Sequence, residues 1–168
     1  MQALTRFCIA TLLLSGIYTG AQAQKVFFLF AHGQYASPVK KSFSDNYGYG
    51  MGAEAGTGIG AGKTFFTGTV GYSFFDARSG TEASNLTYIP IKFGVRKYFL
   101  PANLIFLHAD AGMAKLKVKG GDNFSRFTAD VGGGVKLGPL ELGIAYDGFV
   151  DDGFNSWVSF KAGFRIGI

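Results

Sequence analysis

Cysteine is almost absent from this 168-residue chain, and the single one, Cys8, lies in an apolar stretch near the N-terminus. An exported chain without cysteine pairs is not a small extracellular module held together by disulfides. Beyond residue 23, no segment stays apolar for the roughly 18 residues that indicate a transmembrane helix. If the remaining chain lies in a membrane, it must therefore do so as a closed β-barrel, because open strand edges are not tolerated in lipid.

The first 23 residues have the pattern of a secretory signal peptide. Arg6 supplies a positive charge, residues 7–17 form an apolar core, and Ala21-Gln22-Ala23 is a small-x-small cleavage site. An N-terminal anchor helix is the alternative, but the apolar run is shorter than the ~20 residues that a span needs. We therefore predict cleavage after Ala23 and a single domain over residues 24–168.

Basic residues exceed acidic ones, but they are not concentrated in one region. Removing Arg6 with the signal peptide leaves 15 basic and 11 acidic residues, a net charge of +4. Scattered charge of this kind does not predict a nucleic-acid partner. Five lysines fall in or beside predicted outer loops, where they are either solvated or attract acidic groups of lipopolysaccharide or of a partner protein: Lys40, Lys41, Lys115, Lys117 and Lys119.

The end of the chain shows a clear period of two. The even positions are apolar: Val158, Phe160, Ala162, Phe164, Ile166 and Ile168. The odd positions are small, polar or charged apart from the tryptophan: Trp157, Ser159, Lys161, Gly163, Arg165 and Gly167. This alternation predicts a β-strand with two unlike environments on its two faces.

The same alternation recurs along the chain and predicts eight strands. They are Lys25–Tyr35, Tyr47–Ile59, Lys63–Phe75, Leu86–Leu100, Leu104–Lys115, Phe124–Leu137, Leu140–Phe149 and Trp157–Ile168. Transmembrane strands of about 9–11 residues, longer polar loops alternating with tight turns, and an even strand number are typical of outer-membrane barrels. The predicted fold is all-β, an eight-stranded antiparallel up-and-down transmembrane β-barrel.

One face of these strands collects most of the charge. If the apolar face meets lipid, the following residues form a network in the lumen: Glu54, Lys92, Arg96, His108, Asp110, Arg126, Asp130, Lys136, Glu141, Asp147, Lys161 and Arg165. Eight strands leave just enough interior space for side chains. Because unpaired buried charges are costly, we expect these groups to pair and plug the interior. A soluble lipocalin-like barrel would need the opposite assignment of faces.

Aromatic residues near the strand ends predict girdles at the two membrane interfaces. The predicted girdle residues are Tyr47, Tyr49, Phe74, Phe75, Tyr98, Phe99, Tyr146 and Phe149. Residues 56–64 resemble a phosphate-binding loop, but position 57 is Thr where the motif needs Gly, and a predicted strand follows where the motif needs a helix. We interpret this segment as a turn.

Several stretches resemble a known family. They are residues 88–99 (YIPIKFGVRKYF), 107–112 (LHADAG), 132–138 (GGGVKLG) and the closing strand. On these the chain resembles the small outer-membrane β-barrel proteins of Bacteroidetes-type bacteria, related in architecture to OmpA- and OmpX-like barrels. The resemblance implies that the barrel assembly machinery recognises the last strand during insertion. Family members usually end in an aromatic residue, whereas this sequence ends in Ile168, with Phe164 four residues earlier.

These observations predict an integral protein of the cell outer membrane with a structural, adhesive or interaction role through its outer loops and without catalysis. The expected partners are outer-membrane lipid and lipopolysaccharide, with an unknown extracellular partner, and no cofactor or metal is predicted. Two alternatives stay open. One is a lipid-modifying enzyme of the outer leaflet that uses His108 and Asp110, and the other is a narrow porin-like channel.

Overall fold

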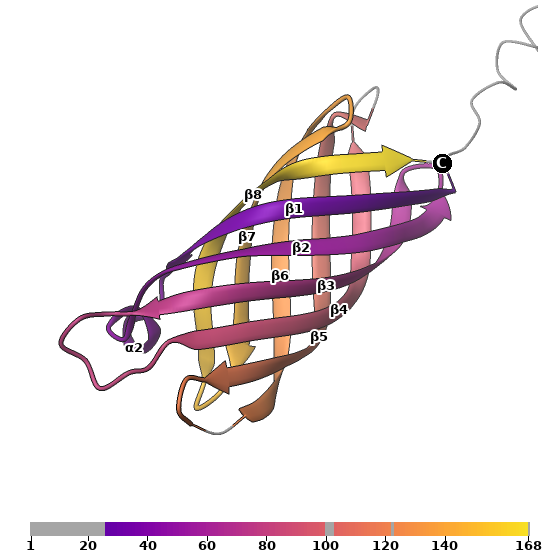
Figure 1. Cartoon of the computed structure of the whole chain (residues 1–168). Helices are drawn as coiled ribbons and strands as arrows, with labels where there is room; N and C mark the ends of the chain where they lie inside the picture. Colours follow the sequence, from indigo (N-terminus) through magenta and orange to yellow (C-terminus); the bar gives the residue numbers. More distant parts are fainter. Residues whose placement is uncertain (1–25, 100–102, 122, 168) are drawn as a thin grey trace, which may run out of the picture.

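Eight antiparallel strands close into a barrel in simple sequence order, from β1 to β8 (Figure 1). The structure, a computed structural model, describes residues 26–99, 103–121 and 123–167. The strands are β1 (Phe27–Pro38), β2 (Tyr47–Ala61), β3 (Thr64–Ala77), β4 (Leu86–Phe99), β5 (Ile105–Val118), β6 (Asn123–Leu137), β7 (Leu140–Val150) and β8 (Phe154–Gly167). The predicted fold class is confirmed. The predicted signal peptide lies outside the described residues.

Pairing of the first strand with the last closes the ring. The β1–β8 pairing runs from Phe28 opposite Gly167 to Pro38 opposite Trp157, so neither strand keeps a free edge along this stretch. A closed ring removes the unpaired backbone groups that an open sheet exposes. Among the described residues, no helix is long and apolar enough to cross a membrane. The short helix α2 (Lys41–Ser44) lies in the connection between β1 and β2.

The connections differ from the predicted alternation of long and short. Residues 39–46 and 78–85 form the two long loops, but residues 119–122 and 151–153 connect their strands with short links. The prediction was wrong for these loops because β5, β7 and β8 continue pairing past their predicted ends. The segment that resembles a phosphate-binding loop forms the end of β2, the start of β3 and the tight turn between them, with Gly62 at φ 64°.

The outer wall of the barrel is apolar along every strand. On β8, Phe160, Phe164 and Ile166 are 53%, 63% and 65% exposed, whereas Lys161 and Arg165 point inward and are buried. The same division holds on β4, where Ile91 and Phe93 are exposed and Lys92 is buried. A water-soluble protein rarely exposes a continuous apolar surface of this extent.

Apolar side chains also fill both ends of the interior, which the sequence did not predict. Near α2, a cluster is centred on Trp157 and includes Phe43 from the helix itself, together with Ala36, Phe75, Leu86, Tyr88, Ala114, Leu116 and Phe149. Near the opposite end, a second cluster consists of Phe28, Phe30, Phe65, Tyr98 and Phe106. We call these the outer cluster and the inner cluster. The charged residues therefore occupy a layer between two aromatic layers.

Four of the predicted girdle residues belong to these clusters instead. Phe75, Tyr98 and Phe149 are buried inside the barrel, and Tyr47 packs against the outer cluster. The other four, Tyr49, Phe74, Phe99 and Tyr146, are on the outer wall. The prediction was wrong for half of the set because successive strand residues point to opposite faces. Phe74 and Phe75 therefore cannot both contact the interface.

Glycine on the inner face allows neighbouring strands to approach closely, and this can be tested. A Cβ atom at Gly112 would lie 2.0 Å from the carbonyl oxygen of Ile91 and 2.8 Å from the Cα atom of Lys92. These are backbone atoms that cannot rotate away. We expect Gly112→Ala to lower the free energy of unfolding by about 1–3 kcal/mol or more, in line with overpacked cores, as measured by urea unfolding in detergent micelles.

Gly33→Ala is the matched control for this substitution. Gly33 lies on the outer wall of β1, and the nearest atom to its added Cβ is a carbonyl oxygen at an ordinary 3.9 Å. We expect this variant to keep the parent stability or gain slightly, since alanine lowers the entropy of the unfolded chain. Equal stability of the two variants would contradict the close-approach argument.

Candidate functional site

The candidate site is the layer of buried charge in the middle of the barrel, which we call the ionic layer. Ten of the twelve residues predicted to face the lumen are buried there: Glu54, Lys92, Arg96, His108, Asp110, Asp130, Glu141, Asp147, Lys161 and Arg165. They come from all strands except β1 and β3. Their burial follows from the alternation of faces, since residues on either side of an inward-facing strand residue point to the outer wall.

Two lysines organise the carboxylates on one side of this layer. The Lys92 ammonium donates to Asp130 Oδ2 and, at 3.1 Å, to Asp147 Oδ1. The Lys161 ammonium donates to Glu54 Oε2 at 2.9 Å and lies 3.8 Å from Asp147 Oδ2, which also accepts a hydrogen bond from Ser159. Each lysine contacts a carboxylate on a strand that is not adjacent to its own. These shared ion pairs therefore connect separate parts of the barrel wall across the lumen.

Glu141 is the corresponding centre toward the inner cluster. Its Oε2 accepts a hydrogen bond from Arg96 Nη1 at 3.0 Å and lies 3.1 Å from His32 Nε2. Its Oε1 accepts from the Tyr98 hydroxyl at 3.1 Å and lies 3.9 Å from Arg165 Nε. This one carboxylate therefore contacts side chains from β1, β4 and β8.

The two arginines also join the ionic layer to the inner cluster. The Arg96 guanidinium lies 4.5 Å from the ring centre of Phe30 and 4.7 Å from that of Phe106. The Arg165 guanidinium lies 4.1 Å from the ring centre of Phe28. Such cation–π contacts stabilise guanidinium groups that are buried away from water. The inner cluster therefore closes the lumen and supports its charge at the same time.

Arg126 and Lys136, the other two predicted residues, are half-buried and do not belong to the ionic layer. Arg126 lies near the outer end, where its Nε donates to Asp151 Oδ1 at 2.8 Å and its guanidinium stacks over the Phe124 ring. Lys136 lies close to the opposite end, one residue before the last residue of β6. Both are on the inward face, but each is too near its strand end for the interior to enclose it.

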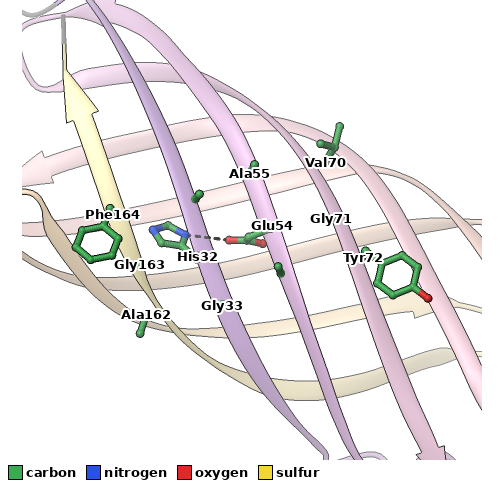
Figure 2. Close-up of a pocket in the computed structure, with 12 residues that line it drawn as sticks. His32, Gly33, Glu54, Ala55, Val70, Gly71, Tyr72, Ala162, Gly163 and Phe164 are labelled. Atoms are coloured by element: carbon green, nitrogen blue, oxygen red, sulfur yellow. Dashed lines mark hydrogen bonds and ion pairs between the residues drawn. The ribbon is translucent and has the colours of Figure 1, made fainter.

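His32 is a member of the layer that sequence reasoning did not select. Its Nδ1 lies 3.3 Å from Glu54 Oε1, as the dashed line in Figure 2 shows, and its Nε2 lies 3.1 Å from Glu141 Oε2. The signal was present in the sequence, because His32 alternates with outward-facing residues of β1. What the sequence lacked was any indication of partners, which lie 22 and 109 residues away.

Little space is left around these groups. A cavity of about 10 Å³ lies among His32, Arg96, His108 and Lys161. That is room for about one water molecule. A hollow of about 580 Å³ lies instead over the outer wall, where small residues of β1, β2 and β8 stand between the larger side chains Val70, Tyr72 and Phe164 (Figure 2).

Comparison with solved structures identifies the architecture. Neisserial surface protein A aligns with a TM-score of 0.62 and 16% sequence identity, covering 84% of this chain and 97% of that one. The fold is that of the small eight-stranded outer-membrane barrels. OprG from Pseudomonas aeruginosa (TM-score 0.49, 10% identity, 84% and 96% coverage) and Ail of Yersinia pestis (0.48, 14%, 83% and 96%) align more loosely. No family model and no curated protein sequence matches the chain.

Proposed function

We propose that the protein is an integral outer-membrane barrel with a closed interior, which acts through its outer loops and not by transport or catalysis. The observation that carries this proposal is the combination of an apolar outer wall with a lumen packed by side chains, in which the cavity beside the ionic layer holds about 10 Å³. A lipid-facing wall favours insertion into a bilayer. A lumen filled with paired charges and aromatic rings leaves the two ends of the barrel as its sites of contact with other molecules.

Orientation follows from the even number of strands. Phe28 and Gly167 are paired at one end of the barrel, opposite α2 and the two long loops (Figure 1). Outer-membrane barrels keep their short turns and chain ends in the periplasm, so the α2 end faces outward. This end carries a hollow of about 280 Å³, lined by Phe43, Tyr47 and Phe149 and by the polar residues Asp151 and Asn155. It is a natural surface for the unknown extracellular partner.

Lipid contact, including lipopolysaccharide, is part of the same proposal. Lys115 and Lys117 are exposed near the outer end of β5 and point to the outer wall, on either side of the buried Leu116. Their cross-strand neighbours on β6 are Ser125 and Asn123. Lysines and polar groups at this level of the wall suit the phosphate groups of outer-leaflet lipid. Recognition by the barrel assembly machinery stays a prediction from the resemblance.

The two alternative functions have less support. His108 and Asp110 are buried in the ionic layer, where the adjoining cavity of about 10 Å³ does not admit a lipid headgroup. A narrow channel would need a water path, but the outer and inner clusters cover the ionic layer on both sides. Placement of these residues therefore favours a structural role over catalysis or conduction.

The test uses residues 24–168, refolded in detergent and reconstituted in planar bilayers. On a detergent gel, we expect the unheated sample to migrate differently from the boiled one, as for a barrel that stays folded in detergent. In the bilayer recordings, we expect no steady conductance. In cells, carbonate washing should leave the protein in the membrane fraction. Release by carbonate would contradict membrane insertion, and a steady conductance would contradict the closed interior.

A further inference from the structure

Four buried polar atoms of the ionic layer have no hydrogen-bond partner among the described residues, Arg96 Nε, Arg165 Nε, His108 Nδ1 and Asp130 Oδ1, and the last two belong to one cluster. His108 and Asp110 are two residues apart on β5, and Asp130 is paired with Asp110 across the β5–β6 ladder. All three side chains are more than nine-tenths buried. One nitrogen or oxygen atom of each lies within 4.8 Å of the corresponding atoms of the other two. We call these three residues the His108 group.

The hydrogen bonds of this group are incomplete. Asp130 Oδ1 lies 3.1 Å from His108 Nε2, within ion-pair distance but without hydrogen-bond geometry, and His108 Nδ1 has no hydrogen-bond partner. Asp110 Oδ1 accepts a hydrogen bond from the Thr67 hydroxyl at 2.7 Å. A buried polar atom without a partner costs about 1–3 kcal/mol and requires an explanation, such as an ion that the site is built to hold.

Charge is unbalanced in the same place. Among the described residues, the buried carboxylates are Glu54, Asp110, Asp130, Glu141 and Asp147, whereas the buried lysines and arginines are Lys92, Arg96, Lys161 and Arg165. With His32 and His108 neutral, five negative groups against four positive ones leave one excess negative charge. Asp130 stands between Asp110 and Asp147 in the strand register, so three carboxylates adjoin one another. A bound cation would balance this side of the layer.

We infer that His108, Asp110 and Asp130 bind a divalent transition-metal ion of the Zn²⁺ class. One imidazole nitrogen with two carboxylate oxygens is a donor set for such ions, whereas Ca²⁺ and Mg²⁺ prefer oxygen alone. Lys92 contacts Oδ2 of Asp130, which leaves Oδ1 for the ion. Water would complete the coordination. The ion would hold β5 to β6 and supply the missing positive charge.

His32 provides a matched control, because it has two carboxylate neighbours in the same layer. Its two ring nitrogens each lie close to a different carboxylate, Glu54 on one side and Glu141 on the other. The imidazole ring therefore separates the two glutamates, and their oxygens do not converge with it on a common point. The chain has two histidines in all, so any imidazole ligand is one or the other.

The experiment titrates untagged, refolded, chelator-treated protein with Zn²⁺ by calorimetry and with Co²⁺ by visible absorption. We expect one equivalent to bind the parent protein and His32→Gln. In His108→Gln and Asp110→Asn we expect an affinity at least about tenfold lower, since even outer-shell partners of a metal contribute 10–100-fold. Asp110→Asn keeps the side-chain shape and removes one of the five buried carboxylates, so it should fold.

Folding of each variant is checked by its migration on gels without heating. X-ray absorption of the Zn²⁺-loaded His32→Gln variant gives a second, independent readout, because an imidazole ligand seen there can come only from His108. Absence of stoichiometric binding to the parent protein would overturn the inference. So would unchanged affinity in Asp110→Asn, or a zinc spectrum of His32→Gln that lacks an imidazole ligand.

Discussion

Lys92→Met is expected to lower the free energy of unfolding by about 3–5 kcal/mol, the cost of removing one partner from a buried ion pair. Methionine is similar in length and fills the same space. The expected loss of stability therefore comes from the missing charge and not from a cavity. Lys92 contacts both Asp130 and Asp147, and the five buried carboxylates of the layer already outnumber its four lysines and arginines. Urea unfolding in micelles, followed by fluorescence of Trp157, measures the loss, because this is the one tryptophan of the chain.

Lys97→Met is the control for Lys92→Met. Lys97 is on the same strand but points outward, with its ammonium 5.7 Å from the Phe99 ring. We expect a change of about 1 kcal/mol or less, as for other exposed charges. A double variant, Lys92→Met with Asp130→Asn, should recover part of the stability because it removes one of the unpaired carboxylates. Equal losses in the two lysine variants would show that the ionic layer does not carry the stability assigned to it.

Trp157→Ala is expected to destabilise the barrel by a similar amount, about 3–5 kcal/mol, as for other large-to-small core changes. The Trp157 side chain is fully buried, and its ring lies 4.8 Å from the ring centre of Phe75 and 5.1 Å from that of Tyr88. It also contacts Phe43, the residue through which α2 covers the outer mouth. The variant removes the tryptophan signal, so circular dichroism during urea unfolding is the measurement.

Phe160→Ala is the matched control on the same strand. Phe160 points to the outer wall and is 53% exposed, so its removal leaves no cavity in the lumen. We expect it to cost clearly less than Trp157→Ala. Trp157→Phe should fall between the parent and the alanine variant, since it keeps part of the packing. If Phe160→Ala lowered the free energy of unfolding more than Trp157→Ala, the outer cluster would not be the main apolar contribution to stability at this end.

Packing inside the barrel also explains why half of the predicted girdle was misplaced. The sequence shows aromatic residues at strand ends, and both a lipid interface and a packed lumen favour them. Alternation separates the two cases, and it assigns Phe75 and Tyr98 to the same face as the charged residues. Phe43 gave no such signal, since it lies in a loop helix of four residues, and its burial depends on how that loop folds over the mouth.

The sequence by itself determined the number of strands, the order in which they pair and the face that each residue occupies. A period of two is a local property of the backbone, and eight such segments in succession favour an antiparallel ring. The tertiary structure alone decided which charges meet. His32 reaches Glu141 across 109 positions of the chain, and Lys92 reaches Asp147 across 55. Strand tilt and the stagger around the ring set these partners, and no local pattern encodes that stagger.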